Sequence, residues 1–173
     1  MYKRQHLINL CIQEGEFPSI LKISKITPVF KKGNINSINN YRPIAITPVL
    51  SKIFEKALYH QMYEHLESHN ILSPNQHGFR RNKSTISALC CLTNIICNAF
   101  DSKQFVEASF YDLTKAFDCV ASENLIGRLK QYNFSSQSSL VIKSFLTNRY
   151  QVVHYNNECS NLWPVPLGVP QGS

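Results

Sequence analysis

Several features that define common protein classes are missing from this 173-residue sequence. It holds no run of about 18 apolar residues, so we expect no transmembrane helix. The basic start of the chain leads into a mildly apolar stretch, but Asn9 interrupts that stretch and no small-residue cleavage site follows. We therefore expect no secretory leader. Charged residues make up only 17% of the chain and hydrophobic residues 43%, which predicts about one folded domain with a real core.

The six cysteines lack the spacing of a zinc ribbon or a disulfide framework, since no Cys-x-x-Cys pair occurs. Cys90 and Cys91 lie in an apolar helical pattern, and we predict that they are buried thiols in a reducing compartment. An intracellular protein is expected, and the choice between nucleus and cytoplasm stays open.

Two catalytic signatures are also missing. The sequence has neither a Gly-x-Ser-x-Gly elbow nor a Gly-x-x-x-x-Gly-Lys phosphate loop. His65 and His69 share a helix face and could bind a metal, but no Glu follows His65 directly as a zinc protease requires. Together with His60, they are better explained as a solvated helix face.

What is present is an uneven charge. Lys and Arg number 18 against 11 Asp and Glu, and the excess lies in residues 1–60, which carry nine basic and three acidic side chains. From residue 101 onward the two signs balance at six each. A basic front suits a polyanion, and carboxylates further along suit metal ions, a combination that nucleotide polymerases need.

The hydrophobic pattern predicts strands that alternate with long helices. Strands are expected at 24–33, 44–47, 105–112 and 150–155, with a loop at 34–43 and Pro43 at a strand start or edge. Helices are expected from Ser51 to a cap at Asn70, from a cap at Ser84 or Thr85 through Ala99, and at about 122–132 and 137–147.

Asp112 closes the apolar run 105–112. Taken alone, an aspartate between a strand and a helix is usually a helix cap. The chemical alternative is a Mg²⁺ ligand, because that ion prefers carboxylate oxygens and often shares its coordination sphere with phosphates.

Six motifs in one order carry a family resemblance. They are Asn40-Tyr-Arg-Pro-Ile44, Leu50-Ser-Lys-Ile-Phe-Glu55, Gln76-His-Gly-Phe-Arg80 with Ser84-Thr85, Tyr111-Asp-Leu-Thr-Lys-Ala-Phe-Asp118, Phe145-Leu-Thr-Asn-Arg-Tyr-Gln-Val152 and Gly168-Val-Pro-Gln-Gly-Ser173. From about Phe17 onward the chain resembles the reverse transcriptase domain of non-LTR (LINE-type) retrotransposons. An unrelated α/β enzyme would need all six matches to arise by chance.

The resemblance implies an α+β fold, the fingers and an incomplete palm of a right-hand polymerase. Residues 1–16 would be a lead-in, 17–103 the fingers and 104–173 the first part of the palm, without a thumb. Its substrates would be an RNA template, a DNA primer and dNTPs, with no membrane involved.

The resemblance also assigns residues. Asp112 matches the first palm aspartate, a catalytic ligand of both Mg²⁺ ions. Phe117 matches the bulky residue that excludes a ribose 2′-hydroxyl, which is compatible with a core role. Gln171 matches a glutamine that lines the nucleotide pocket.

Basic fingers residues complete the assignment. Arg42 and Lys52 match positions that approach the triphosphate, although both could equally be solvated. Gly78 and Arg80 match a motif near the template, and we extend phosphate contact to Arg81; a structural role at the start of a helix is the alternative.

A second palm motif, Tyr-x-Asp-Asp, is not found, since the three Asp of the sequence lie at 101, 112 and 118. We therefore expect a fragment of an RNA-directed DNA polymerase that is inactive alone. The alternative is a noncatalytic fragment that binds nucleic acid.

Overall fold

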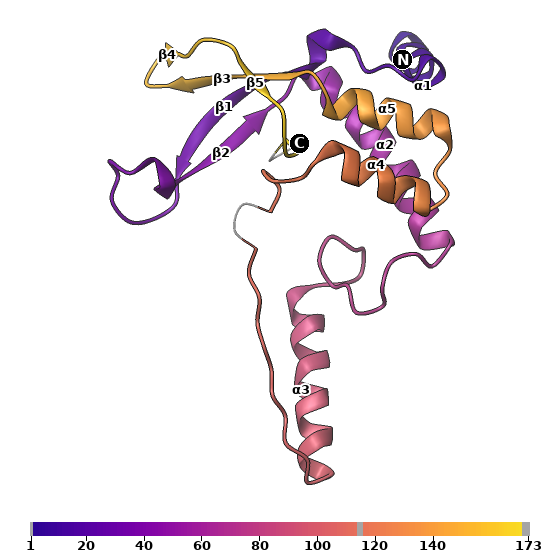
Figure 1. Cartoon of the computed structure of the whole chain (residues 1–173), viewed down its shortest axis with the longest axis vertical. Helices are drawn as coiled ribbons and strands as arrows, with labels where there is room; N and C mark the ends of the chain where they lie inside the picture. The colour runs from indigo at the N-terminus through magenta and orange to yellow at the C-terminus, as the bar shows by residue number, and fades with distance from the viewer. Residues whose placement is uncertain (1, 114–115, 171–173) are drawn as a thin grey trace. The chain divides into compact units, whose positions relative to one another are not determined.

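The structure, a computed structural model, describes residues 2–113 and 116–170. These residues form an α+β fold, as expected, with helices and a mixed sheet (Figure 1). In chain order the elements are α1 (Tyr2–Glu14), η1 (Ser19–Lys22), β1 (Ile23–Phe30), η2 (Ile38–Asn40), β2 (Tyr41–Ile46), α2 (Val49–Ser68), α3 (Thr85–Asp101), α4 (Ser122–Gln131), α5 (Ser136–Leu146), β3 (Arg149–Tyr155), β4 (Glu158–Cys159) and β5 (Trp163–Val165).

Packing divides the chain into two compact units, which are described separately. The first unit comprises Met1–Met62 and Lys115–Ser173, and the second comprises Tyr63–Thr114. Helix α2 begins in the first unit and ends in the second.

The sheet belongs to the first unit and has the order β2-β1-β3-β4, with β5 also paired to β3. β1 and β2 form an antiparallel hairpin, whereas β1 and β3 run parallel. The strands predicted near 24–33, 44–47 and 150–155 are confirmed as β1, β2 and β3. Pro43 lies on β2, which is an edge strand and pairs only with β1 in the described sheet. A proline is tolerated there because an edge strand has no neighbour on its outer side that needs the missing N–H.

Helices α1, α2, α4 and α5 supply the core of the first unit, and Figure 1 shows them grouped beside the sheet. Phe17 is its centre, with ring contacts at 4.9 Å to Phe54 and 5.0 Å to Phe145. A second cluster joins α4 to α5 through four buried side chains: Ile126, Leu129, Ile142 and Leu146.

Helix α1 was not expected from the sequence. It ends at Glu14 and is followed by Gly15, whose φ of 72° is the left-handed conformation that commonly terminates helices. The Gly15 and Glu16 amides then donate to the carbonyls of Ile12 and Cys11. This closure turns the chain so that Phe17 enters the core.

The second unit contains α3, which begins at the predicted place. The Ser84 hydroxyl accepts from the Ser87 amide, and the Ser87 hydroxyl accepts from the Ser84 amide, which forms a capping box. No residue of α3 is buried. The prediction that Cys90 and Cys91 are buried is therefore wrong, since both thiols are exposed.

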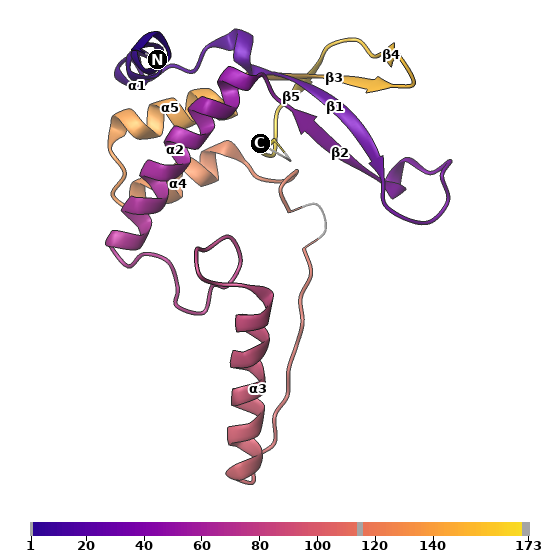
Figure 2. The ribbon, with the colours of Figure 1, turned by 180° about the vertical axis from the view of Figure 1, so that it is seen from behind.

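The prediction of a strand at 105–112 is also wrong. Residues 104–113 form no regular structure, and they run as an extended segment after α3 (Figure 2). A strand exists only through hydrogen bonds to a neighbouring strand, and none of β1 to β5 pairs with this segment. Its apolar side chains are exposed accordingly, with Phe105, Phe110 and Tyr111 the most prominent.

Each helix among residues 2–113 and 116–170 falls short of the length and apolar character that crossing a membrane requires.

Candidate functional site

One cavity of about 250 Å³ in the first unit brings several motifs together. One wall is a face of the sheet, because side chains two apart on a strand share a face. The rest of the lining comes from Asp118 and from the segment Leu167–Pro170. The sheet residues that line the cavity are Ser24, Ile26, Pro43, Ala45, Arg149, Tyr150, Gln151 and Val165.

Gly168 fixes the contact between two motifs that lie about fifty residues apart. Its amide donates to the Val120 carbonyl at 2.8 Å, and the Val169 amide donates to the Phe117 carbonyl at 2.9 Å. Gly168 has a φ of 79°, and a Cβ there would lie 2.8 Å from backbone atoms of both Phe117 and Asp118. Only glycine permits so close an approach.

Two of the predicted nucleotide-site residues belong to these motifs. Phe117 lies in the turn that Gly168 contacts, and its side chain is 49% exposed. Gln171 follows Pro170 directly in the sequence, but it lies outside the described residues.

Arg149 also belongs to this cavity, although the sequence pattern assigned it no role. It is 7% exposed and lines the cavity. Its Nε donates to the Leu146 carbonyl at 3.2 Å, and its Nη2 donates to the carbonyls of Leu167, at 3.0 Å, and Gly168. Burial lowers the pKa of this guanidinium. The feature of the sequence that could have identified Arg149 is its position inside the family motif at 145–152.

The two candidate triphosphate residues are exposed on different elements. Arg42 lies on β2 and pairs with Val29 of β1. Because neighbouring residues of a strand point to opposite faces of the sheet, Arg42 points to the face opposite that of Pro43. Lys52 lies in the first turn of α2, beside the buried Ser51, whose hydroxyl donates to Glu55 Oε1 at 2.6 Å.

Asp112 lies in the second unit, exposed near the end of the segment 104–113. The sequence predicts that Asp112 ends a strand, but the segment 104–113 in which it lies forms no strand.

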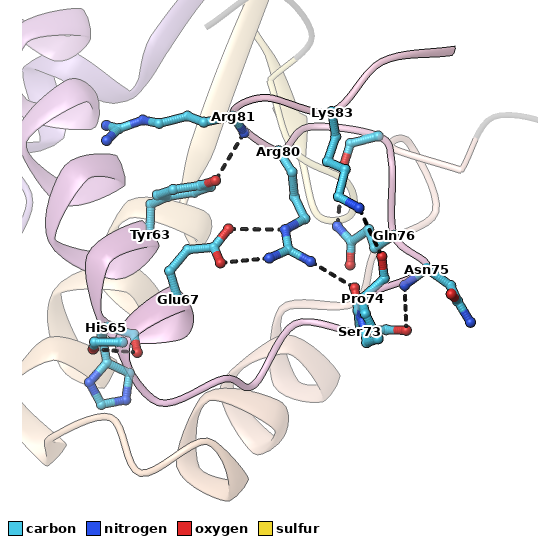
Figure 3. Close-up of polar contacts among 12 residues, drawn as sticks. Tyr63, His65, Glu67, Ser73, Pro74, Asn75, Gln76, Arg80, Arg81 and Lys83 are labelled. Carbon is cyan, nitrogen blue, oxygen red and sulfur yellow. Dashed lines mark hydrogen bonds and ion pairs between the residues drawn. The ribbon is translucent and has the colours of Figure 1, made fainter. Parts of the chain in front are cut away.

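The Gln-His-Gly-Phe-Arg motif forms a closed loop in the second unit (Figure 3). Arg80 is held by Glu67 through two hydrogen bonds of 3.0 and 2.6 Å, and it also donates to the Ser73 carbonyl at 2.8 Å. The hydrogen bonds from Arg80 lower the pKa of Glu67. The paired carboxylate in turn raises the pKa of Arg80. These contacts favour the structural alternative for Arg80.

Arg81 is held differently. Its backbone amide donates to the Tyr63 hydroxyl at 2.9 Å, and its guanidinium lies 5.0 Å from the centre of the Tyr63 ring, a cation–π geometry (Figure 3). His77 joins the loop to α3, since its Nδ1 lies 2.7 Å from the Ser87 hydroxyl. Gly78 is exposed, with a carbonyl that accepts from Gln76 Nε2 at 3.3 Å.

The two histidines that the sequence places on one helix face, His65 and His69, lie side by side. The rings of His65 and His69 lie 4.4 Å apart, and His69 Nδ1 lies 2.9 Å from the His65 carbonyl. Within residues 2–113 and 116–170 no three His, Cys, Asp or Glu side chains gather as metal ligands.

Comparison with known protein families decides the identity of the chain. The family model described as reverse transcriptase (RNA-dependent DNA polymerase) matches residues 29–173. This chain belongs to the reverse transcriptase family. The match includes all six of the motifs named above, and it starts within β1.

The similar reverse transcriptases confirm the resemblance to the non-LTR retrotransposon type. In Drosophila melanogaster, the probable RNA-directed DNA polymerase from transposon BS is 33% identical over 168 residues, and the one from mobile element jockey is 30% identical. The probable polymerase from transposon X-element is 31% identical. Each alignment covers 96% of this chain but 18% of the relative, so the chain spans under a fifth of their length.

A divalent metal is implied by this reverse transcriptase family. The family resemblance assigns Asp112 as a ligand, and within the described residues no three His, Cys, Asp or Glu side chains gather there as metal ligands. One carboxylate cannot satisfy an ion that prefers six oxygens in octahedral array. The residues described here therefore do not fit a complete magnesium site.

Proposed function

We propose that this chain is the part of an RNA-directed DNA polymerase that contributes the fingers, residues 17–103, and the first part of the palm, residues 104–173. Its substrates would be an RNA template, a DNA primer and dNTPs. The contact between the Phe117 turn and Gly168–Val169 supports this proposal, because it joins the two motifs that would hold a nucleotide.

Each assigned side chain has a chemical task in this proposal. Phe117 would lie against the sugar, where a ring leaves no room for a 2′-hydroxyl, and Gln171 would contact the nucleotide. Arg42 and Lys52 would offset the charge of the triphosphate, for which guanidinium and ammonium groups are suited. Asp112 would be one Mg²⁺ ligand among several.

The template side of the proposal rests on the loop of the second unit. The guanidinium of Arg80 already donates two hydrogen bonds to the Glu67 carboxylate, which offsets its charge. Arg81 is exposed and is therefore the better candidate for a phosphate contact. Gly78 is exposed on the same loop, where its backbone would let a strand approach closely. Arg80 would then act by holding the loop in shape.

Nucleotide selectivity tests the proposal. The wild-type chain should bind dATP with Mg²⁺ more tightly than ATP, and Phe117→Ala should narrow that preference at least about threefold, because a steric exclusion is removed. Phe100→Ala is the matched control, since Phe100 is 68% exposed on α3. Titration by NMR or calorimetry measures both affinities. Equal preference in wild type and Phe117→Ala would contradict the assignment.

A noncatalytic nucleic-acid-binding role is the second candidate, and exposed cations favour it. Lys31 and Lys32 are exposed in the loop that connects β1 to β2, and Arg42 is exposed near the start of β2. Binding to an RNA–DNA hybrid should then weaken steeply with salt as counterions are released. Arg81→Ala should flatten that salt dependence by about one phosphate contact, and Arg80→Ala should do so less. Hybrid binding without any nucleotide preference would favour this candidate.

A further inference from the structure

Arg149 lies buried where a chain normally places an apolar residue. It is the first residue of β3, three positions after the last residue of α5. Taking a guanidinium out of water is costly unless its N–H groups find acceptors. Here the acceptors are three backbone carbonyls, those of Leu146, Leu167 and Gly168.

The carbonyls come from two separate places. Leu146 ends α5, and the last carbonyls of a helix lack partners within the helix and carry its partial negative charge. Arg149 supplies a donor and a cation there. Leu167 and Gly168 belong to the segment that follows β5, so one guanidinium ties the helix end to that segment.

The hydrogen bonds of Arg149 reach the peptide between Gly168 and Val169, which contacts Phe117. The Gly168 carbonyl accepts from Arg149, while the Gly168 amide donates to Val120 and the next amide donates to Phe117. The peptide is therefore held from both sides. Because a guanidinium is planar with donors in fixed directions, it sets the orientation of the segment, which a lysine ammonium would not do.

We propose that Arg149 is a positioning residue of the nucleotide pocket. It holds the Gly168 turn against Phe117, so that Phe117 and the backbone of Gly168 and Val169 keep one spacing. This inference rests on the proposed function in one respect only, the statement that the spacing selects the sugar.

The first test measures the turn itself, without nucleotide. In Arg149→Lys, hydrogen exchange at the Gly168 and Val169 amides should accelerate about tenfold, because the carbonyl side of the turn is released. The β1–β2 amides should keep their protection. Arg128→Lys is the matched control, since Arg128 is exposed on α4 and donates to Gln131. Unchanged exchange at Gly168 and Val169 would overturn the proposal.

A measurement on the wild-type chain covers the case in which Arg149→Lys does not fold. The Nε–H of Arg149 donates to Leu146 in a buried position, so it should exchange at least about tenfold more slowly than the Nε–H of Arg128. Equal rates for the two arginines would overturn the proposal.

The second test separates positioning from mere stability. Arg149→Lys should narrow the preference for dATP over ATP at least about threefold, whereas Arg128→Lys should leave it unchanged. Faster exchange with an intact sugar preference would overturn the positioning role. If the wild-type chain shows no sugar preference, the proposed function fails, and the exchange measurement alone decides whether Arg149 holds the turn.

Discussion

The two units differ in what happens to their large apolar side chains. In the first unit Phe17, Phe54 and Val141 are 1%, 2% and 0% exposed, whereas in the second Phe105, Phe110 and Tyr111 are 104%, 82% and 90% exposed. Large apolar residues are present in the sequences of both units. Burial requires an opposing element, and in the described residues only the first unit supplies one for these side chains. An apolar pattern in a sequence thus shows that a segment is suited to packing against an apolar surface. It does not show that such a surface is present in the chain.

The same two units hold their central arginines in different ways. Arg149 donates to backbone carbonyls, which do not titrate, while Arg80 is paired with the Glu67 carboxylate, which does. The first arrangement should be insensitive to acid and the second sensitive.

The largest expected effect separates the two cores. Phe17→Ala should lower the free energy of unfolding by about 3–5 kcal/mol, because it leaves a cavity among Phe54, Phe145 and their neighbours. Phe110→Ala, at an exposed position, should change it by less than about 0.5 kcal/mol. Urea unfolding followed by circular dichroism measures both. Comparable losses would show that the segment 104–113 is packed after all.

Two glycines give the next contrast. Gly168→Ala should cost about 1–3 kcal/mol, because Gly168 has a positive φ and a Cβ would meet backbone atoms. Gly78→Ala should be close to neutral, since among residues 2–113 and 116–170 no atom beyond the adjoining residues lies within 4 Å of its added Cβ. Thermal unfolding of the two variants gives the comparison. A destabilised Gly78→Ala variant would reveal packing around the loop that its open surroundings do not predict.

Acid should open the loop of the second unit before it affects Arg149. The pKa of Glu67 is lowered in the folded chain, so its ion pair is complete above the ordinary glutamate pKa and is lost as the pH falls through the lower, folded value. Exchange at the Arg81 amide, which donates to Tyr63, should therefore accelerate on acidification relative to the intrinsic rate. Glu67→Gln should remove this pH dependence. A wild-type profile identical to that of Glu67→Gln would argue against the pair.

The smallest expected effect is none. Primer extension by the 173-residue chain should equal that of an Asp112→Asn control at any Mg²⁺ or Mn²⁺ concentration, because one carboxylate cannot hold the two ions that in-line phosphoryl transfer uses. A gel assay with labelled primer on an RNA template measures it. Incorporation that disappears in Asp112→Asn would mean that Asp118, Glu107 or a partner chain supplies the remaining ligands.

Local patterns in the sequence predicted most of the elements. Apolar residues three and four apart located α2 to α5, and Ser84 marked the start of α3. Helix α1 escaped because polar side chains such as Gln5 and Asn9 break its apolar stripe. The segment 104–113 was predicted as a strand because 105–112 is an apolar run, but such a run contains no information on the neighbouring strand that it would need as a hydrogen-bonding partner.

The candidate site was less accessible to the sequence. Phe117 and Gln171 came from the family resemblance, since no local pattern joins Phe117 to Gly168. Arg149 was overlooked because a charged side chain is ordinarily exposed, and only the carbonyls around it explain its burial.

The parallel pairing of β1 with β3 has a consequence for the order of folding. Ile23 of β1 pairs with Tyr150 of β3, so β1 is synthesised well before the strand that it pairs with. Until then the hairpin of β1 and β2 leaves the other edge of β1 open to any extended chain. Closing so long a loop is slow, and this interval is when the nascent protein should most need a chaperone.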